Sequence, residues 1–155
     1  MLNEYEEKLK EFMNEHQVVG EHLSFAQSCH SVAEAAHAAQ APLDSFVKNV
    51  CMIDSQGGVI VCIVKGEGRA STERVAKALG IERPRLATPD EILLKTGYPC
   101  GGTPSFGFTA QFLVDERVME KDVVYTGGGS QNSLVKIAPT EILRVNSGKV
   151  VRIRK

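Results

Sequence analysis

The hydrophobic and polar positions of the chain repeat with two periods, one typical of helices and the other of strands. Near the N-terminus, apolar residues recur at helical spacing between Glu and Lys, which predicts an amphipathic helix over about residues 2–16. An alanine-rich run predicts a helix that Ser31 caps, that Glu34 supports in a capping box, and that Pro42 ends. Cap and glycine signals predict three further helices, over residues 71–79, 89–96 and 139–143.

Two apolar runs on either side of a Gly-Gly turn predict a β-hairpin, with strands at residues 46–54 and 59–64. The unbroken apolar character of these runs predicts that both faces of the hairpin are covered. Shorter runs predict further strands at residues 85–87, 111–114, 123–125, 134–137 and 150–153. Together, these helices and strands predict an α+β fold, with a mixed, mostly antiparallel sheet or a partly closed barrel surrounded by four or five short helices.

Composition and charge narrow the class of protein. The chain has 155 residues, of which 43% are hydrophobic and 24% charged, as expected for one globular domain over residues 1–155 with its core at about 20–153. The net charge of −1 gives no overall basic character, so no DNA partner is expected. The chain has no apolar run of about 18 residues and begins with an acidic segment, so we expect a cytoplasmic protein without membrane contact.

Cysteine and glycine spacing gives no sign of a metal or a cofactor. The four cysteines are Cys29, Cys51, Cys62 and Cys100. They form no C-x-x-C pair, and they have no metal-ligand spacing with the four histidines. A Gly66-x-Gly68 pair lies between a strand and a helix, but the third glycine of a dinucleotide fingerprint is missing. We therefore expect reduced cysteines, no metal and no cofactor.

Residues 97–108, hereafter the glycine loop, hold four of the 14 glycines, two of the six prolines and three aromatic rings. Glycine permits positive φ and close backbone approach, and proline removes a donor, so this segment is neither a regular helix nor a central strand. The lack of charge and the rings favour an ordered loop that presents backbone amides to a ligand. The alternative is a proline-rich connection that merely covers the core.

Two further features accompany this loop. Lys48 is a cation in an otherwise apolar strand, so its ammonium either reaches the surface from the strand end or is held in a pocket to meet an anion or a polarised carbonyl. A second glycine cluster, at residues 127–129, follows a predicted strand. The two glycine-rich segments are expected to face each other across a pocket.

Four motifs occur in order along the chain: FVKNV at residues 46–50, GYPCGGTPSFG at 97–107, YTGGG at 125–129 and IAPTEIL at 137–143. In this order they resemble the YbaK/prolyl-tRNA-synthetase-associated editing domain family. The second motif is similar to the family's GYxxGGxxPFG loop, the third is similar to its Tyr-x-Ser-x-Gly segment, and Lys48 stands where the family carries its lysine. The resemblance covers essentially residues 20–153.

The resemblance implies a free-standing deacylase that hydrolyses the ester bond of mischarged aminoacyl-tRNA. The implied substrate is tRNA(Pro) carrying Ala, Ser or Cys, and the implied partners are the acceptor end of the tRNA and prolyl-tRNA synthetase. Lys48 is the expected catalytic residue, holding the substrate by its charge. The expected substrate-binding residues are Ser31, Gly101, Gly102, Thr103, Pro104, Ser105, Gly128 and Gly129.

An aminoacyl ester is already activated, so no covalent nucleophile is required. Backbone N–H groups of residues 101–105 that stabilise the developing oxyanion, together with a positioned water, would suffice. By resemblance, the ribose hydroxyl of the substrate assists the water.

The chain departs from the family pattern at two positions. Ser105 stands where the family has proline, and Phe108 stands where many relatives have a charged or polar residue. The first departure keeps open a non-catalytic module that binds aminoacyl-tRNA or assists a synthetase. A separate alternative is a Cys–His nucleophile made of Cys100 and one of four histidines: His16, His22, His30 or His37.

Overall fold

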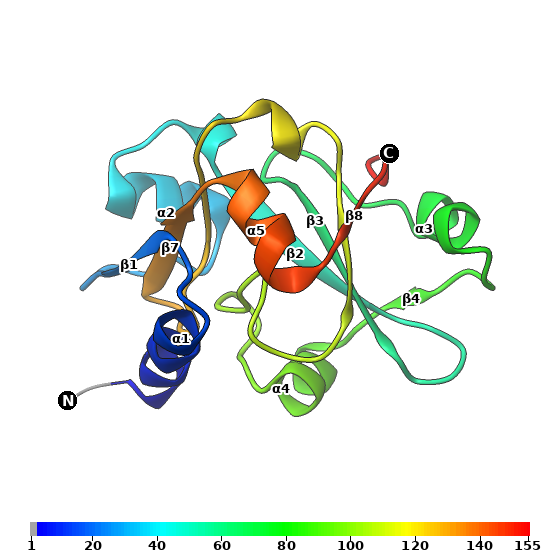
Figure 1. Cartoon of the computed structure of the whole chain (residues 1–155), viewed down its shortest axis with the longest axis horizontal. Coiled ribbons are helices and arrows are strands. Elements are labelled where there is room, and N and C mark those ends of the chain that lie inside the picture. The colour runs from blue at the N-terminus through cyan, green and yellow to red at the C-terminus, as the bar shows by residue number, and fades with distance from the viewer. Residues whose placement is uncertain (1–2) are drawn as a thin grey trace.

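The predicted hairpin forms the middle of a five-stranded sheet in the computed structural model, which describes residues 3–155 (Figure 1). Strand β2 (Val47–Ile53) pairs antiparallel with β3 (Val59–Lys65) and, at its far end, with β4 (Arg85–Leu86). On the other side, β3 is parallel to β5 (Gln111–Val114), which is parallel to β8 (Lys149–Val150). The interior positions of β3 are all buried, as its apolar run predicts.

A second, three-stranded antiparallel sheet is ordered β1 (Gly20–Ser24), β7 (Ser133–Ile137), β6 (Val124–Gly127). Strand β1 is missing from the sequence-based prediction, because GEHLS has no alternating apolar pattern and is fixed only by its pairing with β7. One parallel bridge, between Phe46 and Tyr125, joins the two sheets, and the rings of these residues stack at 4.8 Å.

Within residues 3–155 the fold has five α-helices: α1 (Glu4–Glu15), α2 (Val32–Ala39), α3 (Thr72–Leu79), α4 (Pro89–Thr96) and α5 (Pro139–Asn146). Two 3₁₀ helices, η1 (Leu43–Ser45) and η2 (Val118–Glu120), complete the set. The predicted α+β fold class is therefore confirmed, as one mixed and one antiparallel open sheet with short helices and, among the described strands, no closed barrel.

Helix ends follow the predicted signals with some differences. The predicted capping box at Thr88 is complete. At α2, Ser31 accepts from the Glu34 N–H, but its hydroxyl donates to the Glu34 carboxylate at 3.2 Å, so this box is only half formed. Helix α2 also ends before Pro42, at Gln40 with a left-handed φ of 52°. The predicted first helical residue, Leu2, lies outside the described residues.

The predicted last strand is shorter than expected, because the C-terminal residues pair with a different partner. Strand β8 stops at Val150, and the Ser71 N–H then donates to the Ile153 carbonyl at 2.7 Å. Ala70 and Arg154 form an antiparallel bridge. The chain end thus lies against the segment that leads into α3.

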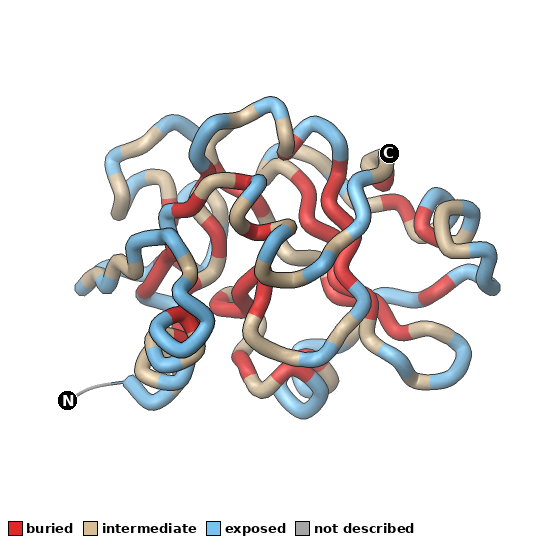
Figure 2. Tube along the Cα trace, in the orientation of Figure 1, coloured by how far each residue is buried: buried red, intermediate tan, exposed pale blue. Residues whose placement is uncertain are grey.

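The core lies on both faces of the five-stranded sheet (Figure 2). On one face, Val61 and Ile63 belong to a large apolar cluster that includes residues of α1, the glycine loop and α5. On the other face, Cys62 and Val64 pack with Val75 of α3. Because successive strand residues point to opposite faces, neighbouring residues of β3 serve different clusters.

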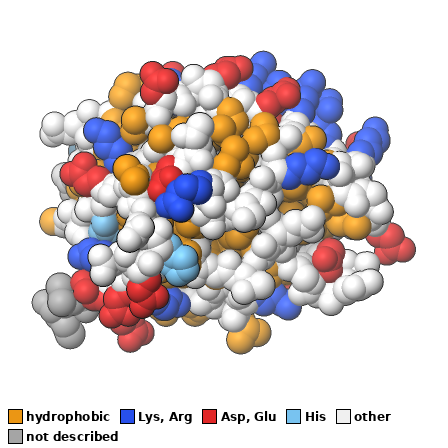
Figure 3. Space-filling view, in the orientation of Figure 1, with side chains coloured by type: hydrophobic (Ala, Val, Ile, Leu, Met, Phe, Trp, Pro, Cys, Tyr) orange, Lys and Arg blue, Asp and Glu red, His pale blue; other side chains and the backbone are white. Residues whose placement is uncertain are grey.

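Charge is distributed unevenly over the surface. Acidic side chains gather where α1 lies, since the first turn of that helix holds Glu4, Glu6 and Glu7. Lys and Arg side chains are frequent near α3 and the C-terminal end, at the upper right of Figure 3. Among the described helices, none has the length and apolar character needed to cross a membrane.

One buried carboxylate fixes the C-terminal segment. Asp115 is 1% exposed and accepts hydrogen bonds from the backbone N–H groups of Ile153, Arg154 and Arg117 and from the Arg154 guanidinium at 3.0 Å. Burial by itself raises the pKa of Asp115, but these donors outweigh burial, and the pKa lies below the ordinary value of 3.8.

We expect Asp115→Asn to reduce the free energy of unfolding by about 2 kcal/mol near neutral pH, because an amide NH₂ would face donors that require an acceptor. Since the folded state binds the proton more weakly than the unfolded state, the wild-type contribution is complete above about pH 4 and is lost as the pH falls further. Urea unfolding from pH 3 to 7 measures both effects. Asp122→Asn, at an exposed carboxylate, is the matched control, and an equal loss there would contradict the assignment.

Candidate functional site

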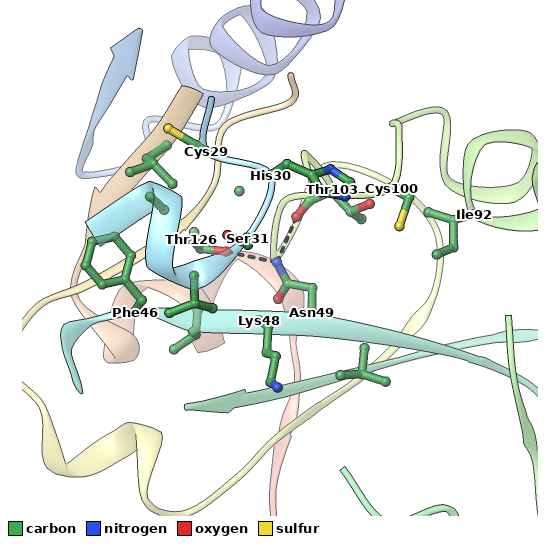
Figure 4. A pocket seen from close by; sticks show the side chains of 17 residues that line it. Cys29, His30, Ser31, Phe46, Lys48, Asn49, Ile92, Cys100, Thr103 and Thr126 are labelled. Atoms are coloured by element: carbon green, nitrogen blue, oxygen red, sulfur yellow. Dashed lines mark hydrogen bonds between the residues drawn. The ribbon is translucent and has the colours of Figure 1, made fainter. Parts of the chain in front are cut away.

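A cavity of about 250 Å³ lies between the start of α2, the first half of β2 and the glycine loop (Figure 4). One part of its wall is apolar and is lined by Val32, Ala35, Phe46, Val47, Val50, Ile92 and Leu134. The other part carries the polar or reactive groups and is lined by Cys29, His30, Ser31, Lys48, Asn49, Cys100, Gly101, Thr103, Thr126 and Gly127. The cavity thus combines an apolar surface with several convergent polar groups, as small-molecule sites do.

Four of the sequence-predicted site residues line this cavity together: Ser31, Lys48, Gly101 and Thr103. They come from α2, β2 and the glycine loop, which are distant in sequence. The remaining five lie behind the lining: Gly102, Pro104, Ser105, Gly128 and Gly129 are all buried. At the second glycine cluster, Gly127 lines the cavity in place of Gly128 and Gly129.

Lys48 pairs with Val64 in the hairpin and is partly exposed. Its side chain leaves β2 on the side opposite to that of Asn49, as the alternation of a strand requires (Figure 4). Within residues 3–155 its ammonium has neither a hydrogen-bond acceptor nor an ion-pair partner. A cation without an internal partner at the edge of a cavity is available to a ligand.

The glycine loop offers backbone donors at the cavity wall. The Gly102 N–H donates to the Pro99 carbonyl at 3.0 Å, whereas the N–H groups of Gly101 and Thr103 have no acceptor within the described chain. Gly101 has a φ of +87°, and a Cβ at this position would lie 2.8 Å from Cε1 of His30. The imidazole of His30 therefore occupies the space that a side chain at position 101 would need.

The two glycine-rich segments touch each other through their backbones. The Gly129 N–H donates to the Gly102 carbonyl at 2.8 Å. A Cβ on Gly102 would lie 2.7 Å from the carbonyl of Ser130, and a Cβ on Gly127 would lie 2.9 Å from the carbonyl of Gly102. This differs from the expectation that they face each other across the pocket: with no side chains between them, the segments pack together into one wall.

Asn49 and Thr126 are among the cavity residues that were not predicted from the sequence. Asn49 donates to the Thr103 carbonyl at 2.8 Å and to the Thr126 hydroxyl at 3.0 Å, and it accepts from Ser105 at 2.8 Å. The available signal at position 49 was an amide side chain that, with Lys48, interrupts an otherwise apolar strand. Such a residue is kept in a core only where its polar groups find partners.

The structure does not assemble the Cys–His alternative. Cys100 and His30 both line the cavity, but the Cys100 sulfur points toward Ile92, and no hydrogen bond joins the two residues within the described chain (Figure 4). His22 instead contacts the Gly128 carbonyl at 2.8 Å and His16 the Phe12 carbonyl at 3.0 Å, while His37 lies in the exposed last turn of α2.

The environments of the other cysteines disfavour thiolates. Burial, and to a lesser degree the charge of Glu34, raises the pKa of Cys29. Burial, with a smaller effect of Cys100, raises the pKa of Cys51 to about 12. Across residues 3–155, no group of three or more His, Cys, Asp or Glu side chains is arranged to hold a metal ion.

Two solved structures share this fold over nearly the whole chain. The structure of hypothetical protein APE2540 has a TM-score of 0.88 and 27% sequence identity, covering 96% of this chain and 99% of that chain. The structure of a candidate trans-editing enzyme for prolyl-tRNA synthetase has a TM-score of 0.91 at 22% identity, covering 100% of this chain and 99% of the other.

At the level of sequence, the family model described as the aminoacyl-tRNA editing domain matches residues 26–145. This chain belongs to the aminoacyl-tRNA editing domain family, and the resemblance inferred from its four motifs is confirmed.

Two curated relatives differ in how much of their own length is matched. The uncharacterised protein YwhH of Bacillus subtilis strain 168 is 24% identical over 128 residues, 81% of each chain. The proline–tRNA ligase of Trichlorobacter lovleyi is 29% identical over 84 residues, which is 54% of this chain but only 15% of the ligase.

We expect Gly102→Ala to reduce the free energy of unfolding by about 2 kcal/mol, because the new methyl group would overlap the backbone of Ser130. Gly68→Ala is the matched control, since its Cβ would meet only the Lys65 carbonyl at 3.4 Å. That control should be neutral or slightly stabilising. Chemical unfolding of both variants checks the prediction, and equal changes would contradict the close packing of the two glycine segments.

Proposed function

We propose that this protein hydrolyses the ester bond of mischarged aminoacyl-tRNA, and that its substrate is tRNA(Pro) carrying a small wrong amino acid such as Ala, Ser or Cys. The observation that carries the proposal is that three residues line one cavity in a member of the editing domain family: Lys48, Gly101 and Thr103. Within residues 3–155, the Lys48 ammonium and the N–H groups of Gly101 and Thr103 have no partner. The errors that it removes would be those of prolyl-tRNA synthetase.

In the proposed mechanism, the aminoacyl group enters the cavity and its carbonyl oxygen accepts from the N–H groups of Gly101 and Thr103. These donors stabilise the charge that develops on this oxygen when water attacks the ester carbon. The bond from the ester carbon to the ribose oxygen of the terminal adenosine then breaks, and that oxygen takes up the proton that the water loses. Because water is the nucleophile, no covalent intermediate with the protein is required. Lys48 holds the 3′-terminal nucleotide or the ester by its positive charge.

The size of the cavity supports a small amino acid. Its volume of about 250 Å³ lies below the range of about 300–1,000 Å³ that is usual for sites of larger ligands. Val32, Ala35 and Leu134 give part of the lining an apolar surface suited to a short side chain. The relationship to a proline–tRNA ligase and to a candidate trans-editing enzyme supports tRNA(Pro) as the carrier.

The charge distribution supports an approach of the RNA that avoids α1. The acidic first turn of α1 repels phosphates, whereas Lys48 and the lysines and arginines near α3 and the C-terminal end attract them. With a net charge of −1, contact with the tRNA would be confined to its acceptor end.

We expect rapid deacylation of one or two members of a panel of tRNAs charged with Ala, Ser, Cys and Pro. Lys48→Ala should lower the rate by about 100-fold or more, because the substrate loses its cationic contact. Lys136→Ala, which removes an exposed strand lysine outside the cavity, should retain the wild-type rate. Stoichiometric binding without turnover by the wild-type protein would instead identify a non-catalytic binding module.

Cys100→Ser should retain at least half of the wild-type deacylation rate, because the proposed attack uses water and not a thiolate. The measurement is the same deacylation assay with the member of the panel that the wild type hydrolyses best. A loss of more than 100-fold would show that the thiol is the nucleophile.

A further inference from the structure

Two cavity-lining side chains, Asn49 and Thr126, and the buried Ser105 behind them form a closed ring of hydrogen bonds, hereafter the Asn49–Ser105–Thr126 ring. The Asn49 amide nitrogen lies 3.0 Å from the Thr126 hydroxyl, the Thr126 hydroxyl lies 2.7 Å from the Ser105 hydroxyl, and the Ser105 hydroxyl lies 2.8 Å from the Asn49 amide oxygen. All three distances are in the range of well-formed hydrogen bonds.

The number of hydrogens fixes the direction of every bond in this ring. The amide oxygen of Asn49 can only accept, so Ser105 must use its single hydroxyl hydrogen to reach it. The hydroxyl of Thr126 must then donate to Ser105, and its own oxygen accepts one amide hydrogen of Asn49. Each donor in the ring has one acceptor, and removing a single hydroxyl leaves partners unsatisfied.

The two hydroxyl-bearing residues of the ring are buried, Asn49 is partly buried, and the three residues come from segments far apart in sequence. Ser105 is 0% and Thr126 1% exposed, so water cannot replace a lost partner without rearrangement. Asn49 belongs to β2 in the five-stranded sheet, Thr126 belongs to β6 in the three-stranded sheet, and Ser105 belongs to the glycine loop. The ring therefore fixes the loop relative to both sheets.

The ring also reaches the cavity surface through a fourth bond. The second amide hydrogen of Asn49 is donated to the Thr103 carbonyl at 2.8 Å. A second hydrogen bond restrains Thr103, since its hydroxyl donates to the Pro99 carbonyl at 3.0 Å. The Ser105 carbonyl, for its part, accepts from the Asn146 side chain at 2.9 Å. Thr103 lines the cavity, and its N–H has no acceptor within residues 3–155. This residue is thus fixed from behind by the ring.

We propose that Asn49, Ser105 and Thr126 are positioning residues that hold the Thr103 N–H where the oxyanion develops. This inference rests on the proposed function and concerns the same site. Ser105 stands at the position where the family carries proline. Proline would restrain the loop through its fixed φ, whereas Ser105 restrains the loop through the hydrogen bond of its hydroxyl to Asn49. The departure at position 105 then preserves the shape of the loop.

The first test compares two substitutions at one position, Thr126→Val and Thr126→Ser. Valine has nearly the shape of threonine but no hydroxyl, so it breaks the ring, whereas serine keeps the hydroxyl. We expect Thr126→Val to lower kcat by about 10-fold to 100-fold with less than a threefold change in KM, because the misplaced donor acts mainly in the transition state. Thr126→Ser should restore most of this loss.

The wild-type protein and Lys48→Ala are assayed first, under conditions in which every variant is shown by circular dichroism to be folded. If the wild type turns over and Thr126→Val keeps a kcat within threefold of it, the positioning role is overturned while the proposed function stands. Ser105→Ala should lower kcat by the same factor as Thr126→Val. The double variant should lose no more kcat than either single variant, since each of these variants breaks the same ring.

A second measurement does not require turnover. Amide hydrogen exchange at Gly102, whose N–H donates to the Pro99 carbonyl directly beside Thr103, is followed by NMR. Exchange at this amide should be at least about tenfold faster in Thr126→Val than in the wild type, and unchanged in Thr126→Ser. An unchanged exchange rate in Thr126→Val would overturn the proposal even if the wild-type protein hydrolysed no member of the tRNA panel.

Discussion

Direct backbone contact between the glycine loop and residues 127–130 is the constraint on which the rest of the site depends. Gly102 and Gly127 lie so close to the opposite backbone that a Cβ on either residue would overlap it. The contact is completed by the hydrogen bond from the Gly129 N–H to the Gly102 carbonyl. The glycine loop leads from α4 toward β5 of the five-stranded sheet, and the other segment ends β6 of the three-stranded sheet. This contact therefore links the two sheets and builds one wall of the cavity.

Helix α1 braces this wall from outside, although it precedes the matched family region at residues 26–145. The Lys8 ammonium donates to the Gly97 carbonyl at 2.8 Å and lies 4.1 Å from the centre of the Tyr98 ring. Glu6 accepts from the hydroxyl of Ser130 at 2.8 Å. Burial raises the pKa of Tyr98 to about 12, so this ring stays neutral beneath the lysine. The helix thus restrains both glycine segments.

The alternation of β2 gives the cavity two kinds of polar group from neighbouring positions. Lys48 leaves the strand on one side and provides a cation that has no partner within residues 3–155, whereas Asn49 leaves it on the other side and makes three side-chain hydrogen bonds. One residue is therefore available to a ligand, and the other holds the protein in shape. A strand whose first half borders the cavity can supply both functions, because successive side chains point in opposite directions.

Local patterns in the sequence determined most of the elements and the family. The apolar runs of β2 and β3, the caps at Ser71 and Thr88 and the composition of the glycine loop are signals contained within a few residues. No local signal predicts strand β1, and none predicts which residues bond to Ser105. Both depend on residues more than twenty positions away in the sequence. The sequence by itself indicated which residues could form the site; only the tertiary structure decided which of them border the cavity, since burial and hydrogen-bond partners arise when distant segments pack.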